Sequence, residues 1–333
     1  MAKAIGRTFS YRAGVRVRGS VLACDATGGS DLIFLSHADV VDGHAARRLP
    51  RARAGRRRIL TTDATLALSG AAGERLRPHA LVAAYGRPFN LGDMRLELFP
   101  SGYGHGAASL LCERDGSRLV YSGPVGTEAP AVRVAHALCL DGTFGSSRYV
   151  FPSLPEALAQ VSTFVQQALA AGRAPVVLTH ASGALLACAG ALAQVGIGLR
   201  AHRAAMGAAA SYRTAGIAVP ALARFAGKLA PGEALLWPVE ARDAPALKRL
   251  VSASFLLASG AAADPATLAR ARVDAAVPLS TMADFAGLLR YVEATAPREV
   301  AVQHAGDGEL CQVLRDRGIE AYAVGPPEQI SLF

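Results

Sequence analysis

SLLCERDGSRLVYSG, residues 109–123, contains two apolar runs separated by Asp115-Gly116. An Asp-Gly pair between apolar runs favours a two-residue turn, because both residues adopt positive φ at little cost. The stretch therefore predicts an antiparallel β-hairpin. Short apolar segments with turn residues between them continue on both sides of it, at 14–26, 31–38, 57–63, 94–102 and 135–145. The first part of the chain is thus expected to be rich in β-strands.

The pattern changes at Ser153. Ser153 and Glu156 have the spacing of a capping box, apolar residues follow at helical intervals, and Gly172 ends the run. Beyond it we expect a strand at 174–182, a helix at 183–196, and a mostly helical region to about Leu229. Strands are expected at 233–241, 253–260, 299–306 and 319–325, and helices at 282–297 and 308–318. Strands first and βα alternation later predict a layered α/β protein with an α/β insertion at about 153–232.

The amino-acid composition indicates a globular protein. The chain has 333 residues, of which 51% are hydrophobic and 18% charged, as in globular proteins. It has neither an apolar run long enough to span a membrane nor the apolar middle of a signal peptide, so we expect a cytoplasmic protein. The five cysteines show no CxxC spacing and are expected to be small core residues.

The formal net charge of +9 is concentrated in GHAARRLPRARAGRRRIL, residues 43–60. Seven arginines lie there: Arg47, Arg48, Arg51, Arg53, Arg56, Arg57 and Arg58. Guanidinium groups bind phosphate oxygens in a bidentate manner, so the stretch is a candidate nucleic-acid-binding segment. The alternative is a solvated, self-repelling loop.

Several segments place polar residues directly after apolar runs, where catalytic side chains often lie. They are SHADVVDGHA (36–45), PSGYGHGAAS (100–109), SGPVG (122–126), DGTFGSSRYVFP (141–152), LSTMADFAGLL (279–289) and QHAG (303–306). A further segment, HRAAMGAAASYRTAGIAVP (202–220), lies in the expected insertion. A lone histidine in such a segment is more often structural than a metal ligand.

In their order these segments resemble the metallo-β-lactamase fold in its nucleic-acid-processing β-CASP branch, most closely the bacterial ligase-associated DNA exonucleases. The likeness spans about residues 20–322. It implies an αββα sandwich with an inserted β-CASP-like α/β region. The expected parts are residues 1–152 and 233–324 of the sandwich, the insert at 153–232, and a tail at 325–333.

The resemblance also implies the positions of the metal ligands. His37, His105 and His304 keep family histidines, and Asp141 keeps an acidic position. Asp39 and Asp42 stand where histidines belong, whereas Val41, Pro124 and Met282 replace an aspartate, the bridging aspartate and a histidine. A two-metal centre needs bridging and terminal ligands, and these three side chains cannot provide them. We therefore expect an inactive nuclease centre without a bound cofactor.

The alternative is one zinc or manganese ion held by some of the surviving donors. The candidate ligands are His37, Asp39, Asp42, His44, His105 and His304, and the candidate catalytic residues are Asp39, Asp42 and Asp141. The competing interpretation is that these side chains hydrogen-bond to one another in an emptied cleft. His202 coincides with a histidine of the family's insert and is a candidate nucleic-acid contact.

The sequence closes on GPPEQISLF, residues 325–333. Gln329, Ile330, Ser331, Leu332 and Phe333 are similar to the bacterial sliding-clamp-binding pentapeptide, whose strongest pattern is QL[SD]LF. In that motif the glutamine amide satisfies polar groups while Leu-Phe fills an apolar groove. The alternative is a tail folded onto the core.

Together these features predict a nucleoid-associated DNA repair or replication accessory protein, recruited by the sliding clamp and binding DNA. Other repair proteins, such as a ligase or a helicase, are candidate partners. The alternatives are an active metal-dependent DNA exo- or endonuclease with a rearranged mononuclear site and, more weakly, an RNA-processing nuclease.

Overall fold

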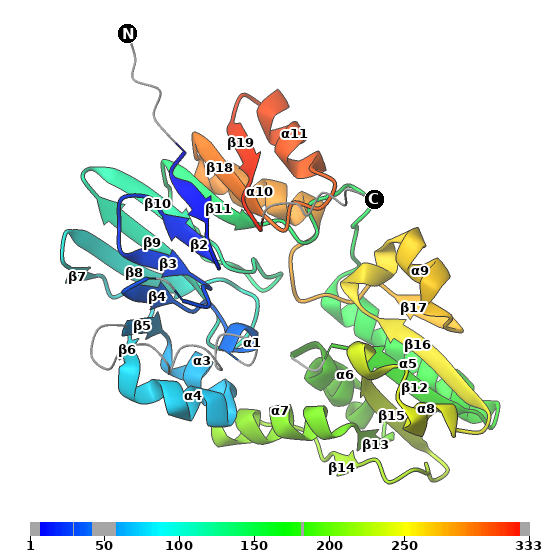
Figure 1. Cartoon of the computed structure of the whole chain (residues 1–333). Helices are drawn as coiled ribbons and strands as arrows, with labels where there is room; N and C mark the ends of the chain where they lie inside the picture. Colours follow the sequence, from blue (N-terminus) through cyan, green and yellow to red (C-terminus); the bar gives the residue numbers. More distant parts are fainter. Residues whose placement is uncertain (1–6, 29, 42–57, 181–182, 327–333) are drawn as a thin grey trace, which may run out of the picture. The chain divides into compact units, whose positions relative to one another are not determined.

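The computed structural model describes residues 7–28, 30–41, 58–180 and 183–326 (Figure 1). The chain divides into two compact units: unit 1 contains residues 1–147 and 285–333, and unit 2 contains residues 148–284. The described residues form three β-sheets with helices on their faces. The expected α/β class is therefore confirmed. Unit 2 extends well past residue 232, where the insertion was expected to end.

Unit 1 contains two mixed sheets. The first has the order β1-β2-β3-β4-β5-β6, and its last four strands are parallel. Its strands are β1 Phe9–Tyr11, β2 Val15–Val17, β3 Leu22–Cys24, β4 Leu32–Phe34, β5 Arg58–Thr61 and β6 Ala80–Val82.

The second sheet has the order β19-β18-β11-β10-β9-β8-β7. Its strands are β7 Phe89–Leu91, β8 Met94–Pro100, β9 Ala108–Arg114, β10 Ser117–Tyr121, β11 Ala137–Asp141, β18 Glu299–Gln303 and β19 Glu320–Ala323. Strands β9 and β10 form the predicted hairpin, with Ser117 opposite Arg114. Asp115 and Gly116 have φ of 48° and 73°, as a type I′ turn requires.

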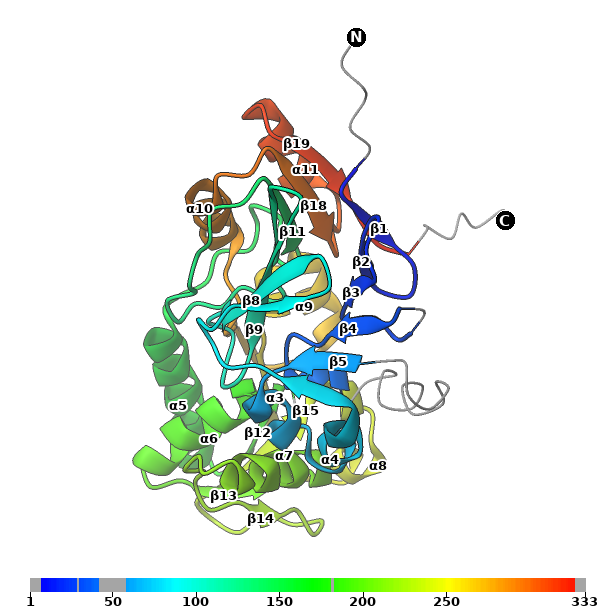
Figure 2. The ribbon, with the colours of Figure 1, turned by 90° about the vertical axis from the view of Figure 1, so that its left-hand side faces the viewer.

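The two sheets pack face to face around one hydrophobic core. Phe9, Leu22 and Phe34 of the first sheet share it with Leu96 and Leu110 of the second. Figure 2 shows the sheets as adjacent layers, with α10 on the outer side of the second sheet. The helices of unit 1 are α1 Ala38–Val40, α3 Asp63–Leu68, α4 Gly70–Leu76, η3 Arg77–His79, α10 Phe285–Thr295 and α11 Glu309–Asp316. Leu66 and Leu76, from α3 and α4, pack on the outer face of the first sheet.

Unit 2 is built on a parallel sheet of order β14-β13-β15-β12-β16-β17. The strands are β12 Ala174–Thr179, β13 Gly198–Ala201, β14 Ala223–Arg224, β15 Glu233–Pro238, β16 Ala253–Ala258 and β17 Ala275–Val277. The helices are α5 Leu154–Ala170, α6 Gly183–Gln194, α7 Arg203–Thr214, η4 Val239–Ala241, α8 Pro245–Lys248, η5 Gly260–Ala263 and α9 Pro265–Ala271. Helices α5, α6 and α7 cover one face and α8 and α9 the other, as expected for a parallel sheet.

Local signals in the sequence were reliable at several points. The capping box of Ser153 and Glu156 begins α5, and all five cysteines are buried and free. The expectation of a mostly helical region to Leu229 was wrong in part, because β13 and β14 lie within it. In the described part of the chain, no helix combines the length and the apolar character that a membrane crossing needs.

Candidate functional site

A hydrogen-bonded chain of three side chains lies at the carboxyl ends of β3 and β4. Asp25 follows β3 and accepts from the backbone N–H of Ser36 (2.8 Å) and from its hydroxyl (2.6 Å). The Ser36 hydroxyl lies 2.7 Å from Nδ1 of His37. A hydroxyl has one proton, and that of Ser36 is given to Asp25, so His37 Nδ1–H donates to Ser36. The chain fixes the tautomer of His37 and leaves its Nε2 unprotonated in the neutral ring.

Tyr121 joins this chain to the second sheet. Its hydroxyl donates to Asp25 Oδ2 (2.8 Å) and lies 3.1 Å from Oε1 of Gln303. Burial is the main cause that raises the pKa of Tyr121, and the negative charge of Asp25 adds to it. The tyrosine therefore remains a neutral donor. It links residues that are far apart in the sequence.

Asp141 and His304 form a second pair because β11 and β18 are parallel neighbours with Asp141 opposite Gln303. His304 Nδ1 lies 3.3 Å from Asp141 Oδ1, which also accepts from the amide (2.9 Å) and hydroxyl (2.6 Å) of Thr143. The hydrogen bond to Asp141 raises the pKa of His304, although partial burial opposes this. Burial alone would raise the pKa of Asp141, but the hydrogen bonds from His304 and Thr143 outweigh it and lower that pKa.

Two further candidates are exposed: Asp39 in the short helix α1 and His105 in a loop. Asp39 accepts from the hydroxyl of Tyr103 (3.1 Å), whose ring packs edge-on against His37 with centroids 5.2 Å apart. His105 is exposed in the loop between β8 and β9. Asp42 and His44 lie outside the described residues.

The residues at the three positions that the resemblance assigns to replaced ligands do not fit a two-metal centre. Val41 is buried in the apolar cluster beneath α3 and α4, and Pro124 is also buried. Met282 is half-buried in unit 2. None of the three side chains carries a hard oxygen or imidazole donor. Within residues 7–28, 30–41, 58–180 and 183–326, no group of three or more His, Cys, Asp or Glu is arranged to hold a metal ion.

The predicted nucleic-acid contacts are only partly described. Arg58 is exposed at the start of β5, while Arg47, Arg48, Arg51, Arg53, Arg56 and Arg57 lie outside the described residues, as do Gln329 to Phe333. His202 caps α7, since its Nδ1 accepts from the amide of Ala204 (3.2 Å). Its ring packs on Trp237, and burial and the charge of Arg203 lower its pKa. These contacts give His202 a structural role.

Sequence reasoning missed a polar cluster at the carboxyl edge of the sheet in unit 2. His180 follows β12 and places Nδ1 2.8 Å from Glu240 and Nε2 3.1 Å from the Ser259 hydroxyl. The order Ser-His-Glu is that of a catalytic triad. However, Ser259 is only 3% exposed and its hydroxyl caps η5 by accepting from Ala261. The cluster therefore links the ends of β12, β15 and β16, and the buried Ser259 hydroxyl is poorly placed to act as a nucleophile.

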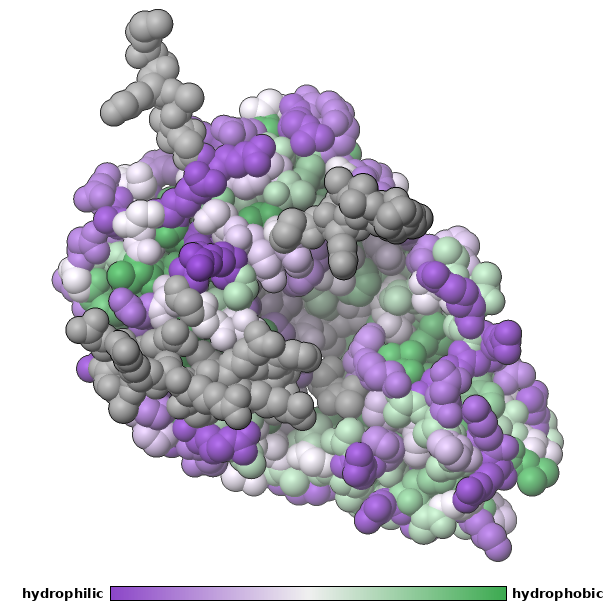
Figure 3. Space-filling view, in the orientation of Figure 1, coloured by the Kyte–Doolittle hydropathy of each residue, from purple (hydrophilic) through white to green (hydrophobic). Residues whose placement is uncertain are grey.

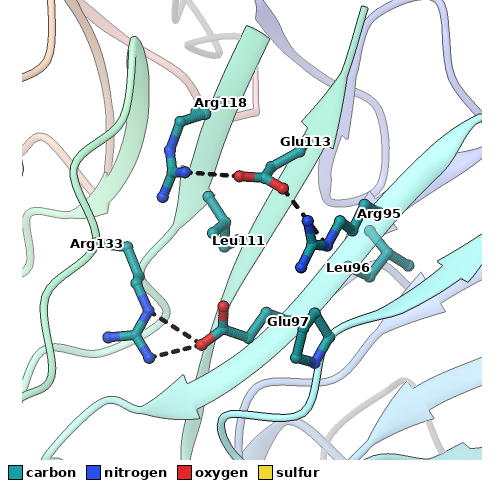
Figure 4. A pocket seen from close by; sticks show the side chains of 8 residues that line it. Arg95, Leu96, Glu97, Leu111, Glu113, Arg118 and Arg133 are labelled. Carbon is teal, nitrogen blue, oxygen red and sulfur yellow. Dashed lines mark hydrogen bonds and ion pairs between the residues drawn. The ribbon is translucent and has the colours of Figure 1, made fainter. Parts of the chain in front are cut away.

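A cavity of about 250 Å³ on the second sheet of unit 1 was also missed (Figure 4). Glu113 lies 2.6 Å from Arg118 and 3.8 Å from Arg95. Glu97 lies 2.6 Å from Arg133, whose guanidinium also stacks over Phe99. Both carboxylates are thus used to balance the surrounding arginines. The only sequence signal was the alternation of charged and apolar residues along β8.

Comparison with known proteins gives one relationship. No protein-family model matches the chain. Over 247 residues the chain is 30% identical to a probable DNA ligase of Opitutus terrae, a match that covers 72% of this chain and 24% of the ligase. The chain is therefore distantly homologous to a segment of a probable DNA ligase and spans about a quarter of that protein's length.

Proposed function

We propose that this protein is a ligase-associated accessory factor of DNA repair or replication that binds DNA without cutting it. The observation that carries the proposal is the homology to a segment of a probable DNA ligase. The ordered motifs that resemble the metallo-β-lactamase/β-CASP nucleases support it, as do the two packed sheets of unit 1 and the parallel sheet of unit 2. Such folds alone do not fix an activity.

The absence of cleavage is proposed from the chemistry of the site. Val41 and Pro124 occupy positions that the resemblance assigns to metal-binding aspartates, and both are buried without a donor on the side chain. Asp25, Asp141 and Ser36 are engaged by their neighbours. These hydrogen-bonded side chains at the carboxyl ends of the strands of unit 1 then serve to stabilise the fold. The protein has no resident cofactor.

A second candidate function is a nuclease with a single cation. One observation favours it: Ser36 holds Nδ1 of His37 and Asp141 holds Nδ1 of His304, which leaves both Nε2 atoms for a ligand. Metal-binding histidines commonly donate a hydrogen bond from their other ring nitrogen to an oxygen acceptor in this way. One zinc or manganese ion bound by these two side chains would supply Lewis-acid chemistry, and its further ligands would have to come from residues outside the described ones, such as Asp42 or His44.

Recruitment by the sliding clamp is proposed from Gln329-Ile330-Ser331-Leu332-Phe333. A clamp-bound tail would raise the local concentration of the protein at DNA, so that modest DNA affinity suffices. A ligase or helicase is a further proposed partner at the same location.

DNA binding by the full chain tests the proposal. Fluorescence anisotropy with labelled single-stranded and duplex oligonucleotides should show binding whose affinity falls as salt rises. Replacing Arg56, Arg57 and Arg58 with alanine should weaken it and lower the salt slope. Removing Leu332 and Phe333 should abolish binding to the clamp and leave DNA binding unchanged. A wild-type protein that binds neither DNA form would reject the proposal.

A further inference from the structure

A groove of about 680 Å³ lies in unit 2 between α8, α9 and the start of β16. Its lining comprises Arg242, Asp243, Leu247, Lys248, Leu250, Phe255, Ala269, Arg270 and Arg272. In Figure 3 the surface near α8 and α9 shows hydrophobic residues bordered by hydrophilic ones. The lining of the groove therefore combines apolar and cationic side chains.

The charge of the groove is strongly unbalanced. Four cationic side chains line it and Asp243 is its one lining carboxylate. The described residues place none of these four cations in an ion pair. Arg242 and Arg270 donate instead to backbone carbonyls of Arg272 and Ala266, which leaves their positive charges uncompensated. This is the opposite of the cavity in unit 1, where each carboxylate is paired with arginine.

The groove lies in a different part of the sheet from two histidines that follow its strands. Phe255 lies near the start of β16 and Arg272 precedes β17, so both mark the amino end of the parallel sheet. His180 and His202 follow β12 and β13 at the carboxyl end. The groove thus lies on the face covered by α8 and α9 and extends to the amino ends of β16 and β17.

The chemistry of the lining identifies the ligand. A nucleotide strand presents anionic phosphates and apolar base faces at the same time. Arginines bind phosphate oxygens through two N–H groups, and an aromatic ring such as that of Phe255 offers a surface on which a base can stack. Leu247 and Leu250 extend the apolar lining beside Phe255. Paired bases inside a duplex would not reach such a lining, which favours an unpaired strand.

We propose that the groove between α8 and α9 binds single-stranded DNA, with its cations on phosphates and Phe255 against a base. The inference rests on the proposed DNA-binding function and assigns it residues other than the arginines at 47–58. Substitutions that remove the positive charge of the groove would weaken binding of single-stranded DNA more than binding of duplex DNA.

The test compares two charge-reversed variants of the full chain. Lys248→Glu with Arg270→Glu changes the groove, and Arg224→Glu with Lys228→Glu makes the same change at exposed positions of unit 2 outside it. Affinity for a labelled oligothymidylate of about 20 nucleotides is measured between about 50 and 200 mM salt. The groove variant should bind about tenfold more weakly with a smaller salt slope, and the control should bind nearly as the wild type does. Circular dichroism confirms that both variants are folded.

The outcomes separate this inference from the proposed function. A wild type that binds no DNA rejects the proposed function. If the wild type binds DNA and the groove variant binds it with equal affinity, the groove is not a DNA-binding site, and the proposed function stands. Lys248 and Arg270 would then only stabilise helix C-termini. Equal losses in the two variants would indicate a general charge effect and overturn the inference about the groove too. So would an equal loss on duplex DNA, or competition by polyglutamate as effective as that by oligothymidylate. Phe255→Leu should weaken binding several-fold without altering the salt slope.

Discussion

The carboxyl edge of unit 1 and the α8–α9 groove of unit 2 differ in how their polar groups are used. At the edge, Asp25, Ser36 and Tyr121 satisfy one another through short hydrogen bonds. In the groove, cations such as Lys248 and Arg270 have no carboxylate partner among the described residues. These three side chains of the edge are thus paired with one another, whereas the cations of the groove are available to an anionic ligand.

The type of a residue is therefore a weaker guide to ligand binding than whether its charge or hydrogen-bonding groups already have partners within the protein. Hydrogen-bonded carboxylates contribute to folding, because a buried polar group without a partner is costly. Uncompensated cations contribute little to folding and attract polyanions. Substitutions at the edge should therefore change stability, whereas substitutions in the groove should change DNA affinity.

The largest effect is expected from Asp25→Ala. The variant removes the acceptor for the Ser36 amide, the Ser36 hydroxyl and the Tyr121 hydroxyl. Leaving these donors unsatisfied should lower the free energy of unfolding by about 3 kcal/mol, as urea denaturation would measure. Asp31→Ala is the matched control, since Asp31 is exposed and its hydrogen bond to the described residues is made by its backbone carbonyl. If Asp25→Ala lowers the free energy of unfolding no more than Asp31→Ala does, the hydrogen bonds of Asp25 do not stabilise the fold.

A smaller, pH-dependent effect is expected from His304→Ala. The pKa of His304 is raised in the folded state, so the stabilisation by its charged form is present below the unfolded pKa and is lost as pH rises through the folded pKa. The side chain is 57% exposed, and solvent screening limits the effect to about 0.5 kcal/mol. Unfolding of wild type and variant should therefore differ at pH about 5.5 and converge at pH about 9. A difference that grows with pH would contradict the assignment.

Asp243→Asn should give the smallest effect and one of opposite sign. It removes the one carboxylate among the residues that line the groove. Single-stranded DNA should then bind about two- to threefold more tightly at low salt, with the gain screened away at high salt. Asp115→Asn, at the exposed hairpin turn of unit 1, provides the control for net charge. An equal gain in both variants would show that the groove has no special role.

The parts of the fold that could be predicted from the sequence are those determined by residues close together in the chain. Asp115-Gly116 encodes its own turn, and Ser153 caps its own helix. The helices α3 and α4 were not predicted, although Thr62 caps the first of them. The strand order of unit 2 could not be predicted locally, because its sheet is assembled from parallel strands whose pairing depends on long-range packing, such as β12 with β15 and β16.

The candidate site was predictable only in part for the same reason. His37, Asp141 and His304 were singled out from motifs, and the structure gives each a hydrogen-bond partner. Asp25 and Tyr121 were overlooked, because their contact joins strands of two different sheets. The groove was overlooked as well, since its cations come from two separate segments around α8 and α9.

The central claim, DNA binding without two-metal cleavage, is tested most directly by one measurement on a single preparation. Protein purified without chelator is analysed for bound zinc and manganese, and the same sample is assayed for cleavage of end-labelled DNA with either metal added. We predict that the DNA is bound and remains intact, without stoichiometric metal. Stoichiometric metal together with cleavage that His105→Ala abolishes would contradict the account and favour the mononuclear nuclease.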